Sequence, residues 1–250
     1  MCRLFLITLL FSQFAVASSV SDQSKFWVEA EASAVWQGKN EVQIPDNTGT
    51  RFSIADLENG ANFAGRIYLG YRLSEKHELR ALYAPLTIDL NGSSGQSISF
   101  QNQVFAANSP LKARYKFNSY RLTYRYIFKE NDRWTLRIGF TGKIRDAQIR
   151  LAQGALSAER SNVGFVPLLH FSAVYDAGEH FRFHFDADAL AAPQGRAEDV
   201  AILVGYKNKP TSPIEYRIGY RTVEGGADGG GDVYNFAWLH YAVAGIHYFF

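Results

Sequence analysis

Apolar and polar residues alternate with a period of two along most of this 250-residue chain, and this alternation restricts its fold more than any other feature. In the segment 26–36, Glu29 and Glu31 lie on one face, while the other face is entirely apolar. The segments 180–190 and 214–223 repeat the pattern with other residues. A period of two is typical of β-strands, and apolar stripes at helical spacing are scarce. The sequence therefore predicts an all-β fold.

The N-terminus has the features of a secretory signal peptide. Residues 1–3 include a positive charge, residues 4–11 are apolar apart from Thr8, and Ala15 and Ala17 form a small-residue cleavage site. We expect residues 1–17 to be removed, rather than to form a buried helix, and residues 18–250 to form a single domain. Removal of Cys2, the only cysteine, excludes a cysteine-based metal site or nucleophile from the mature chain.

Charge and hydropathy exclude two further classes of protein. Lys and Arg number 26 against 24 Asp and Glu, and this near balance argues against a nucleic-acid-binding protein. After residue 17 no apolar run approaches the roughly 20 residues of a membrane-spanning helix. An integral membrane protein of this composition must therefore be a barrel.

The alternating segments predict ten strands, near 26–36, 62–73, 77–90, 112–128, 133–151, 162–176, 180–190, 199–207, 214–223 and 233–250. Short polar connections alternate with longer ones that tend to be rich in Gly, Ser and Asn, such as 37–60 and 91–110. Short turns on one side and long loops on the other are typical of closed antiparallel up-and-down transmembrane β-barrels. We expect a monomeric ten-stranded barrel, with eight or twelve strands as alternatives; a secreted β-sandwich or lipocalin-like barrel also produces alternation.

Aromatic residues give an independent test of the barrel, because transmembrane barrels carry an aromatic girdle at each membrane interface. On nine of the ten strands an aromatic residue lies near the end next to a short turn, as Phe26, Trp134 and Tyr216 do. A sparser set, which includes Trp36 and Phe165, lies near the opposite ends. Two aromatic rims favour the transmembrane barrel over a soluble sandwich.

The last seven residues, Ala244–Phe250, have a terminal Phe, an aromatic residue two positions before it, and apolar residues at alternate positions. This segment resembles the C-terminal strand of Gram-negative outer-membrane β-barrel proteins. The resemblance implies an integral protein of the cell outer membrane, inserted by the barrel assembly machinery, which would read the strand ending in Phe250. It identifies no subfamily with a known activity.

Inward positions of the predicted strands carry many charges. A ten-stranded barrel is close to the size whose interior is filled by side chains, and unpaired charges there would be costly. We therefore predict a salt-bridged network that plugs the lumen, formed by Glu29, Glu31, Arg66, Arg121, Arg125, Arg137, Arg182, Asp186, Asp188, Glu215 and Arg217. The alternative interpretation of the same residues is a narrow channel for small solutes, in which an arginine excess would favour anions.

One hairpin contains the residue types of a nucleophile, a base and an orienting acid. If Asp176 pairs with His180, the candidate catalytic residues meet inside the lumen, with Ser172 opposite His184 and His170 opposite Asp186. An outer-membrane enzyme, either a lipid A hydrolase or an omptin-like protease, is therefore a further alternative. Omptin-type proteases are also ten-stranded and would require paired Asp residues with an Asp–His couple near the outer rim; Asp188 and His240 are the nearest candidates.

The outward face of strand 112–128 continues above its apolar section as a basic stripe. Lys112, Arg114 and Lys116 lie on this stripe, and Arg150 on the neighbouring strand reaches the same level. Such cations suit the phosphates of lipopolysaccharide. We predict an outer-membrane barrel with a plugged lumen and a structural or surface-interaction role, lipopolysaccharide-associated or adhesin-like. No motif predicts a cofactor or a metal, and an enzyme is the less favoured interpretation.

Overall fold

The computed structural model describes residues 25–57, 60–193, 195–228, 230 and 232–250. The predicted signal peptide, residues 1–17, lies outside these residues. Within the described residues, no helix has the length and apolar character needed to cross a membrane.

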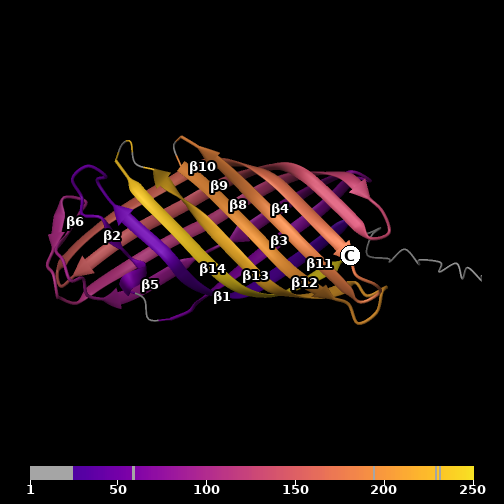
Figure 1. Ribbon diagram of the computed structural model, residues 1–250, viewed down its shortest axis with the longest axis horizontal. Coiled ribbons are helices and arrows are strands. Elements are labelled where there is room, and N and C mark those ends of the chain that lie inside the picture. Colours follow the sequence, from indigo (N-terminus) through magenta and orange to yellow (C-terminus); the bar gives the residue numbers. More distant parts are fainter. Residues whose placement is uncertain (1–24, 58–59, 194, 229, 231) are drawn as a thin grey trace, which may run out of the picture.

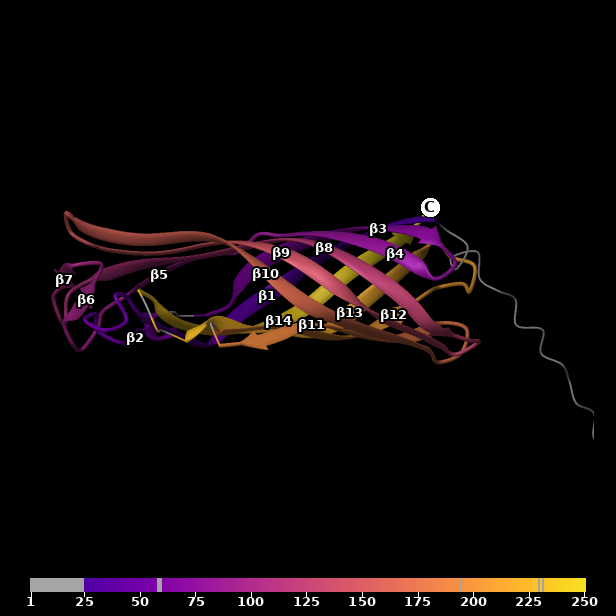
Figure 2. The ribbon, with the colours of Figure 1, turned by 90° about the horizontal axis from the view of Figure 1, so that it is seen from above.

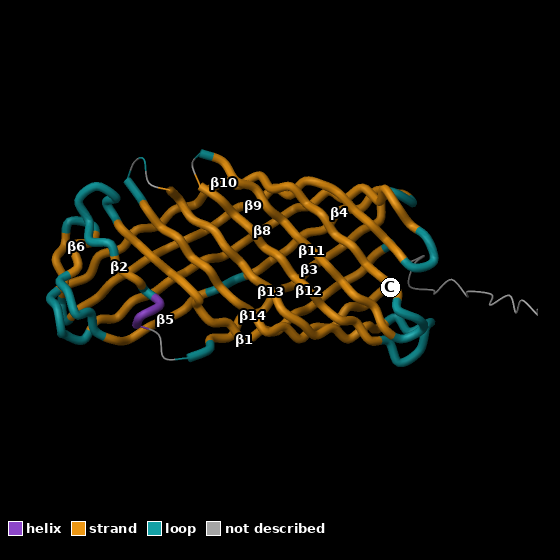
Figure 3. The backbone as a smooth tube through the Cα atoms, viewed as in Figure 1, coloured by secondary structure: helices purple, strands orange, loops and turns teal. Residues whose placement is uncertain are grey.

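Ten antiparallel strands close into a barrel, and the predicted fold class and strand count are confirmed. The ring consists of β1 (Phe26–Gln43), β3 (Asn62–Ser74), β4 (His77–Ala84) with its continuation β5 (Thr87–Gly92), β8 (Leu111–Glu130), β9 (Trp134–Gln153), β10 (Leu156–Asp176), β11 (Phe181–Ala192), β12 (Gly195–Tyr206), β13 (Ile214–Asp228) and β14 (Tyr234–Phe249). Pairing of β14 with β1, as at Ala34 and Ala242, closes the ring. The strands cross the long axis of the molecule at a marked tilt (Figures 1 and 3), as barrel closure requires.

The two ends of the barrel differ in the length of the connections between strands. At one end, here the turn end, the strands are joined by the short segments 75–76, 131–133, 177–180 and 207–213. The chain termini of the barrel also meet there, because the Phe250 N–H donates to the Phe26 carbonyl at 3.1 Å. The opposite end, here the loop end, carries the small elements β2 (Phe52–Ser53), η2 (Ala55–Leu57), β6 (Ile98–Phe100) and β7 (Gln103–Phe105).

Several strands are longer at the loop end than the sequence pattern predicts. Strand β1 continues to Gln43 rather than ending at 36, and β12 starts at Gly195 rather than at 199. Strands β9 and β10 are joined by a two-residue turn in which Gly154 has a φ of +58°, so most of the predicted loop before residue 162 is strand. The outward positions of this extension, such as Ser157 and Glu159, are polar, and without apolar contrast the alternation was not recognisable.

The outward face between the two ends is apolar. Leu122, Phe140 and Ile218 are each more than half exposed, which matches a surface that contacts lipid rather than water. Aromatic residues pair across strands at the turn end, where the ring centroids of Trp134 and Tyr175 are 4.7 Å apart. The outward face therefore has the apolar band and the aromatic rim of a transmembrane barrel.

The ring does not stay closed along its whole length. Pairing between β3 and β4 ends at Ile67 and Tyr83, two residues before Pro85. Pairing between β10 and β11 ends at Leu169 and Ala189, two residues from Pro167. Because proline has no N–H to donate, it is confined to sheet edges and irregularities. The two prolines therefore mark two seams at which the closed ring separates.

Beyond these seams the strands form two facing sheets. Strand β5 pairs only with β8, and residues 156–168 of β10 pair only with β9. One sheet therefore contains β5, β8, β9 and β10, and the other contains the remaining ring strands. Figure 2 shows the ends of β9 and β10 well separated from those of β2 and β14.

The space between the two sheets is filled by an apolar core, which we call the loop-end core. It combines residues of the barrel wall with residues of the loop-end elements, among them Ile44, Ile54, Phe100, Phe105, Leu151 and Leu239. All six are at most 2% exposed. Sequence patterning did not predict this core, which lies at the loop end of the lumen.

Candidate functional site

The turn-end half of the lumen holds the charges, and Asp199 is at their centre. Its carboxylate accepts hydrogen bonds from Arg66 and Arg121 at 2.7 Å and from Arg221 at 2.8 Å. These arginines come from β3, β8 and β13, so one acid on β12 joins four strands. Asp199 was not among the predicted lumen residues, because the predicted strand 199–207 begins at this residue. Asp199 has the same parity as the inward residues Ala201 and Leu203, and this parity could have identified it as a lumen residue.

A second cluster lies nearer the turn end. Arg217 donates to Glu29 at 2.6 Å and to Glu215 at 2.7 Å. His247 lies 3.1 Å from the same Glu29 carboxylate, and His184 lies 2.7 Å from Glu215. Two acids, one arginine and two histidines thus connect β1, β11, β13 and β14.

A third cluster surrounds Glu78, which forms an ion pair with Arg125 at 2.8 Å and accepts a hydrogen bond from Arg137 at 2.9 Å. Close to it, Arg80 forms a two-bond contact with Asp186, at 2.6 and 3.1 Å. Such fork-like contacts hold both planes in a fixed orientation. Together the three clusters connect every strand of the ring except β10.

All eleven residues predicted for the lumen network lie inside the barrel in ion pairs. Glu31 pairs with Arg221 at 2.8 Å, and Arg182 pairs with Asp176. The remaining nine are in the contacts described above or, for Asp188, with Arg121 at 2.9 Å.

The hairpin register of β10 and β11 differs from the predicted one by two residues. Asp176 is opposite Arg182 rather than His180, because five residues, 177–181, lie between the two paired positions instead of three. Ser172 is therefore opposite Asp186, and His170 is opposite Asp188. The predicted pairings of Ser172 with His184 and of His170 with Asp186 are wrong.

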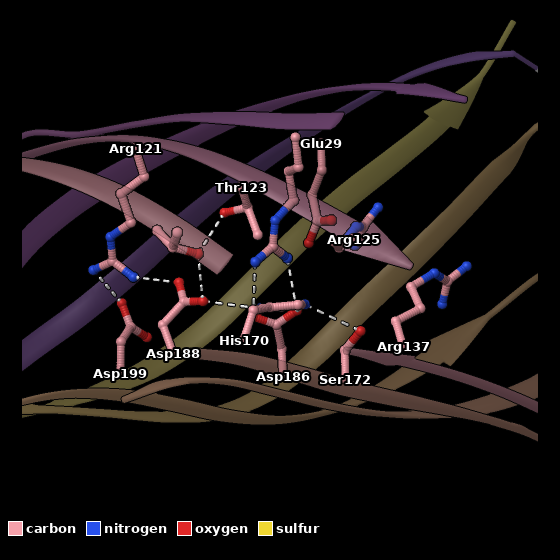
Figure 4. Close-up of polar contacts among 12 residues, drawn as sticks. Glu29, Arg121, Thr123, Arg125, Arg137, His170, Ser172, Asp186, Asp188 and Asp199 are labelled. Carbon is pink, nitrogen blue, oxygen red and sulfur yellow. Dashed lines mark hydrogen bonds and ion pairs between the residues drawn. The ribbon is translucent and has the colours of Figure 1, made fainter. Parts of the chain in front are cut away.

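The observed register places an acid, a histidine and a serine in a row (Figure 4). The Asp188 Oδ1 atom lies 2.8 Å from His170 Nδ1, and His170 Nε2 lies 3.3 Å from Ser172 Oγ. Asp188 also accepts from Thr141 at 2.9 Å. Of the four predicted catalytic residues, His170 and Ser172 belong to this row, Asp186 is held by Arg80, and His184 contacts Glu215.

The omptin-like couple is not formed. Asp188 is buried in the lumen, whereas His240 lies among aromatic rings at the loop end, with its ring centroid 5.6 Å from Trp36 and 4.7 Å from Trp238. In the part of the chain that the structure describes, no group of three or more His, Cys, Asp and Glu side chains is arranged to hold a metal ion.

A cavity of about 120 Å³ occupies the turn-end half of the lumen. Its lining extends from Glu31 and Arg221 in the middle of the barrel to Glu130 and Phe249 at the turn end, and it includes Ser172. The loop-end core closes the opposite side. The cavity is therefore approached from the turn end.

The four predicted lipopolysaccharide contacts lie on the outer surface beyond the apolar band. Arg114 pairs with Asp89 at 2.6 Å, and Lys116 pairs with Asp146 at 2.8 Å. The hydrogen bond from Lys116 holds the pKa of Asp146 below its usual value. Lys112 and Arg150 are exposed, and neither forms an ion pair with another described residue. The basic stripe is thus partly neutralised by its own acids.

Comparison with known proteins identifies the fold. No protein-family model and no curated protein matches the sequence. The outer-membrane protease OmpT of Escherichia coli is similar in structure, with a TM-score of 0.50 at 12% identity, over 90% of this chain and 97% of OmpT. The chain has the fold of a Gram-negative outer-membrane β-barrel protein.

Other outer-membrane barrels also match this barrel over most of its length. The attachment invasion locus protein Ail of Yersinia pestis matches with a TM-score of 0.42 at 8% identity, over 90% of this chain and 99% of Ail. The toluene transporter TodX of Pseudomonas putida matches with a TM-score of 0.37 at 7% identity, over 90% of each chain. At these identities the likeness concerns the fold alone.

Proposed function

We propose that this chain is an integral outer-membrane protein with a closed lumen, and that it has a structural or surface-interaction role at the loop end. The observation that carries the proposal is the loop-end core. Phe100 and Phe105 of the β6–β7 hairpin are at most 1% exposed, as is Leu239 of the barrel wall. A solute that crossed the barrel would have to displace this packed apolar segment.

The ionised half of the lumen supports the same conclusion. Its charges are largely satisfied by one another, so ions and water would gain few contacts on entry. The alternative of a narrow solute channel requires a continuous polar path, and the loop-end core interrupts that path. The proposed barrel is therefore a rigid support rather than a conduit.

Conductance of the purified, refolded protein in planar bilayers tests the closed lumen. We expect no steady open level, with insertion checked by protection of the strands from protease. A variant in which residues 96–107 are replaced by a short Gly-Ser linker removes the β6–β7 hairpin and serves as a sensitised comparison. A steady open level in the unmodified protein would rule out the closed lumen.

The extension at the loop end is the proposed interaction surface. Strand β8 continues for nine residues, 111–119, beyond the outward Tyr120, which at about 3.3 Å per residue is roughly 30 Å of strand. Lys112, Arg114 and Arg150 lie on its outer face, where Arg114 is directly opposite Arg150. Phosphates of lipopolysaccharide suit this arrangement, because they would relieve the repulsion between neighbouring cations.

Charge reversal tests the lipopolysaccharide contact. The double variant Lys112→Glu and Arg150→Glu should weaken binding of lipopolysaccharide to the detergent-solubilised barrel at least about tenfold, since each basic residue near an anionic surface contributes about 1 kcal/mol. The matched control reverses Arg133 and Lys209, which are exposed at the turn end. Equal loss in both double variants, or no loss in either, would contradict the proposed surface.

The same proposal includes the route to the membrane. We infer that residues 1–17 are cleaved, that the barrel acts as a monomer, and that the strand ending in Phe250 is read by the barrel assembly machinery. N-terminal sequencing of the membrane-inserted protein should begin at residue 18. Deletion of Phe250 should reduce the inserted fraction in cells, while refolding into detergent micelles in vitro should still occur.

A further inference from the structure

We propose that Ser172, His170 and Asp188 form a nucleophilic centre that hydrolyses small carboxylic esters entering the lumen from the turn end. This activity is independent of the surface role proposed above. It rests on the order of the three groups, on the hydrogen-bonding capacity of each atom, and on the cavity beside the serine.

Strand geometry brings the three residues together. His170 and Ser172 are two positions apart on β10, so both side chains point into the lumen. Asp188 is directly opposite His170 on β11. The distances are 2.8 Å from Asp188 Oδ1 to His170 Nδ1 and 3.3 Å from His170 Nε2 to Ser172 Oγ. The second distance is within the looser range found for nucleophile and base before substrate is bound.

The hydrogen bonds determine which nitrogen acts as the base. Asp188 pairs with Arg121 at 2.9 Å, so its carboxylate is ionised and can only accept hydrogen bonds. The proton between Asp188 and His170 therefore belongs to Nδ1. This leaves the lone pair of Nε2 directed toward Ser172, as proton transfer from the serine hydroxyl requires.

Two threonines and the packing around the histidine hold Asp188 and His170 in this arrangement. Thr141 donates to Asp188 at 2.9 Å, and Thr123 is 2.8 Å from Thr141. Thr141 and His170 both contact Oδ1 of the carboxylate, while Arg121 donates to Oδ2, so contacts on both oxygens hold its plane. The histidine side chain is fully buried, so its ring orientation is set by packing as well as by Asp188. Figure 4 shows this chain of contacts across the lumen.

The cavity determines what can reach the serine. Ser172 lines it together with Arg80, Arg125 and Arg137, and Arg137 is directly opposite Ser172 on β9. Arg80 and Arg125 each keep a buried Nε–H without a hydrogen-bond partner among the described residues. These cations would stabilise negative charge on the carbonyl oxygen during attack. A volume of about 120 Å³ admits a short acyl group but no lipid chain.

The reaction is ordinary acyl transfer. Ser172 Oγ bonds to the ester carbonyl carbon while His170 Nε2 takes the hydroxyl proton. The bond from that carbon to the alcohol oxygen breaks, and the alcohol leaves with the proton from His170. Water then attacks the acyl-serine, again through His170, and releases the carboxylic acid. Ser172 and His170 are the catalytic residues, and Asp188 is a positioning residue.

The experiment uses the refolded full barrel with diisopropyl fluorophosphate as the covalent probe and p-nitrophenyl acetate as the ester. We expect a single adduct on Ser172 by peptide mass mapping, and ester hydrolysis that falls at least about 100-fold in Ser172→Ala and in His170→Gln. Ser33→Ala is the matched control, because Ser33 is another buried lumen serine and has no histidine as hydrogen-bond partner among the described residues. Heat-modifiable gel mobility verifies folding of every variant.

To separate a positioning role of Asp188 from a purely structural one, the rates of labelling and hydrolysis are measured in variants that fold. Asp188→Asn should slow labelling and hydrolysis in the folded barrel, and Asp188→Glu should restore part of both rates. Absence of an adduct on the folded, unmodified protein would overturn the proposal, as would an adduct that forms at an unchanged rate in His170→Gln.

Discussion

In the turn-end half of the lumen, Asp199 is held by three arginines, whereas in the loop-end half Phe100 and Leu151 pack among aliphatic and aromatic side chains. Both sets of side chains lie inside the same barrel. They are separated by the height at which Pro85 and Pro167 end the pairing of neighbouring strands. On the turn-end side of these prolines the wall is a continuous ring, and on the loop-end side it consists of two facing sheets.

This difference shows how wall geometry and filling depend on each other. A closed ring of ten strands encloses a fixed width, and long arginine side chains can bridge it between distant strands. Two separate sheets are free to approach to the distance of a sandwich, about 10 Å, at which apolar side chains interdigitate. The chain therefore changes from barrel to sandwich along its own strands.

The largest effect should follow loss of the central acid. Asp199→Ala leaves three buried arginines without a shared partner and should lower the unfolding free energy by about 3–5 kcal/mol, measured by urea denaturation in detergent. Arg196→Ala is the control, because its pair with Glu224 is at the surface and should contribute less than about 1 kcal/mol. Similar losses in both variants would show that burial does not distinguish the two pairs.

A cavity in the loop-end core should have the next largest effect. Leu151 is fully buried, and Leu151→Ala should cost about 3 kcal/mol, within the usual range for buried leucines. Salt should not change this loss, since no charge is involved. Leu122→Ala on the lipid face, where the side chain is 57% exposed, should cost clearly less; the reverse order would mean that the core is loosely packed.

Lys143 lies at the boundary between the charged half and the apolar half of the lumen, and it is a charge placed beside the apolar side chains. It is buried, has no carboxylate partner among the described residues, and places its Nζ 4.7 Å from the Phe117 ring centroid. The ring contact offsets about 2 kcal/mol, less than the several kcal/mol that burial of an ion costs. Lys143→Met should therefore stabilise the barrel, by about 1–2 kcal/mol. A destabilised variant, with the exposed Lys129→Met unchanged, would contradict this.

The fold was predictable because the alternation of strands such as β1 and β13 is strong and the turn-end connections are short. The charged lumen followed from the same parity. The loop-end core was missed because parity alone says nothing about position along a strand. On β13, for example, the inward residues change from Glu215 and Arg217 near the turn end to Val223 near the loop end, and this gradient was present in the sequence.

Two other features depended on geometry that the sequence pattern does not fix. The row of Asp188, His170 and Ser172 depends on the number of residues in the turn 177–180, and a shift of two residues exchanges every partner on the lumen face. The seam at Pro167 was recognisable in principle, since a proline within a strand pattern indicates an edge. The identity of the strand that separates there required the structure.

The smallest effect should come from an ion pair whose geometry is the same as that of a buried one. Arg114 contacts Asp89 at 2.6 and 3.1 Å, and Arg80 contacts Asp186 at the same two distances. The first pair is about half exposed, whereas the Arg80 side chain is only 9% exposed. Water and salt screen the exposed charges, and the side chains lose entropy when they pair.

A double-mutant cycle with alanine should therefore give a coupling energy near zero for Arg114 and Asp89, and a clearly larger one, insensitive to salt, for Arg80 and Asp186. Equal coupling energies would mean that distance, not burial, sets the strength of ion pairs in this barrel.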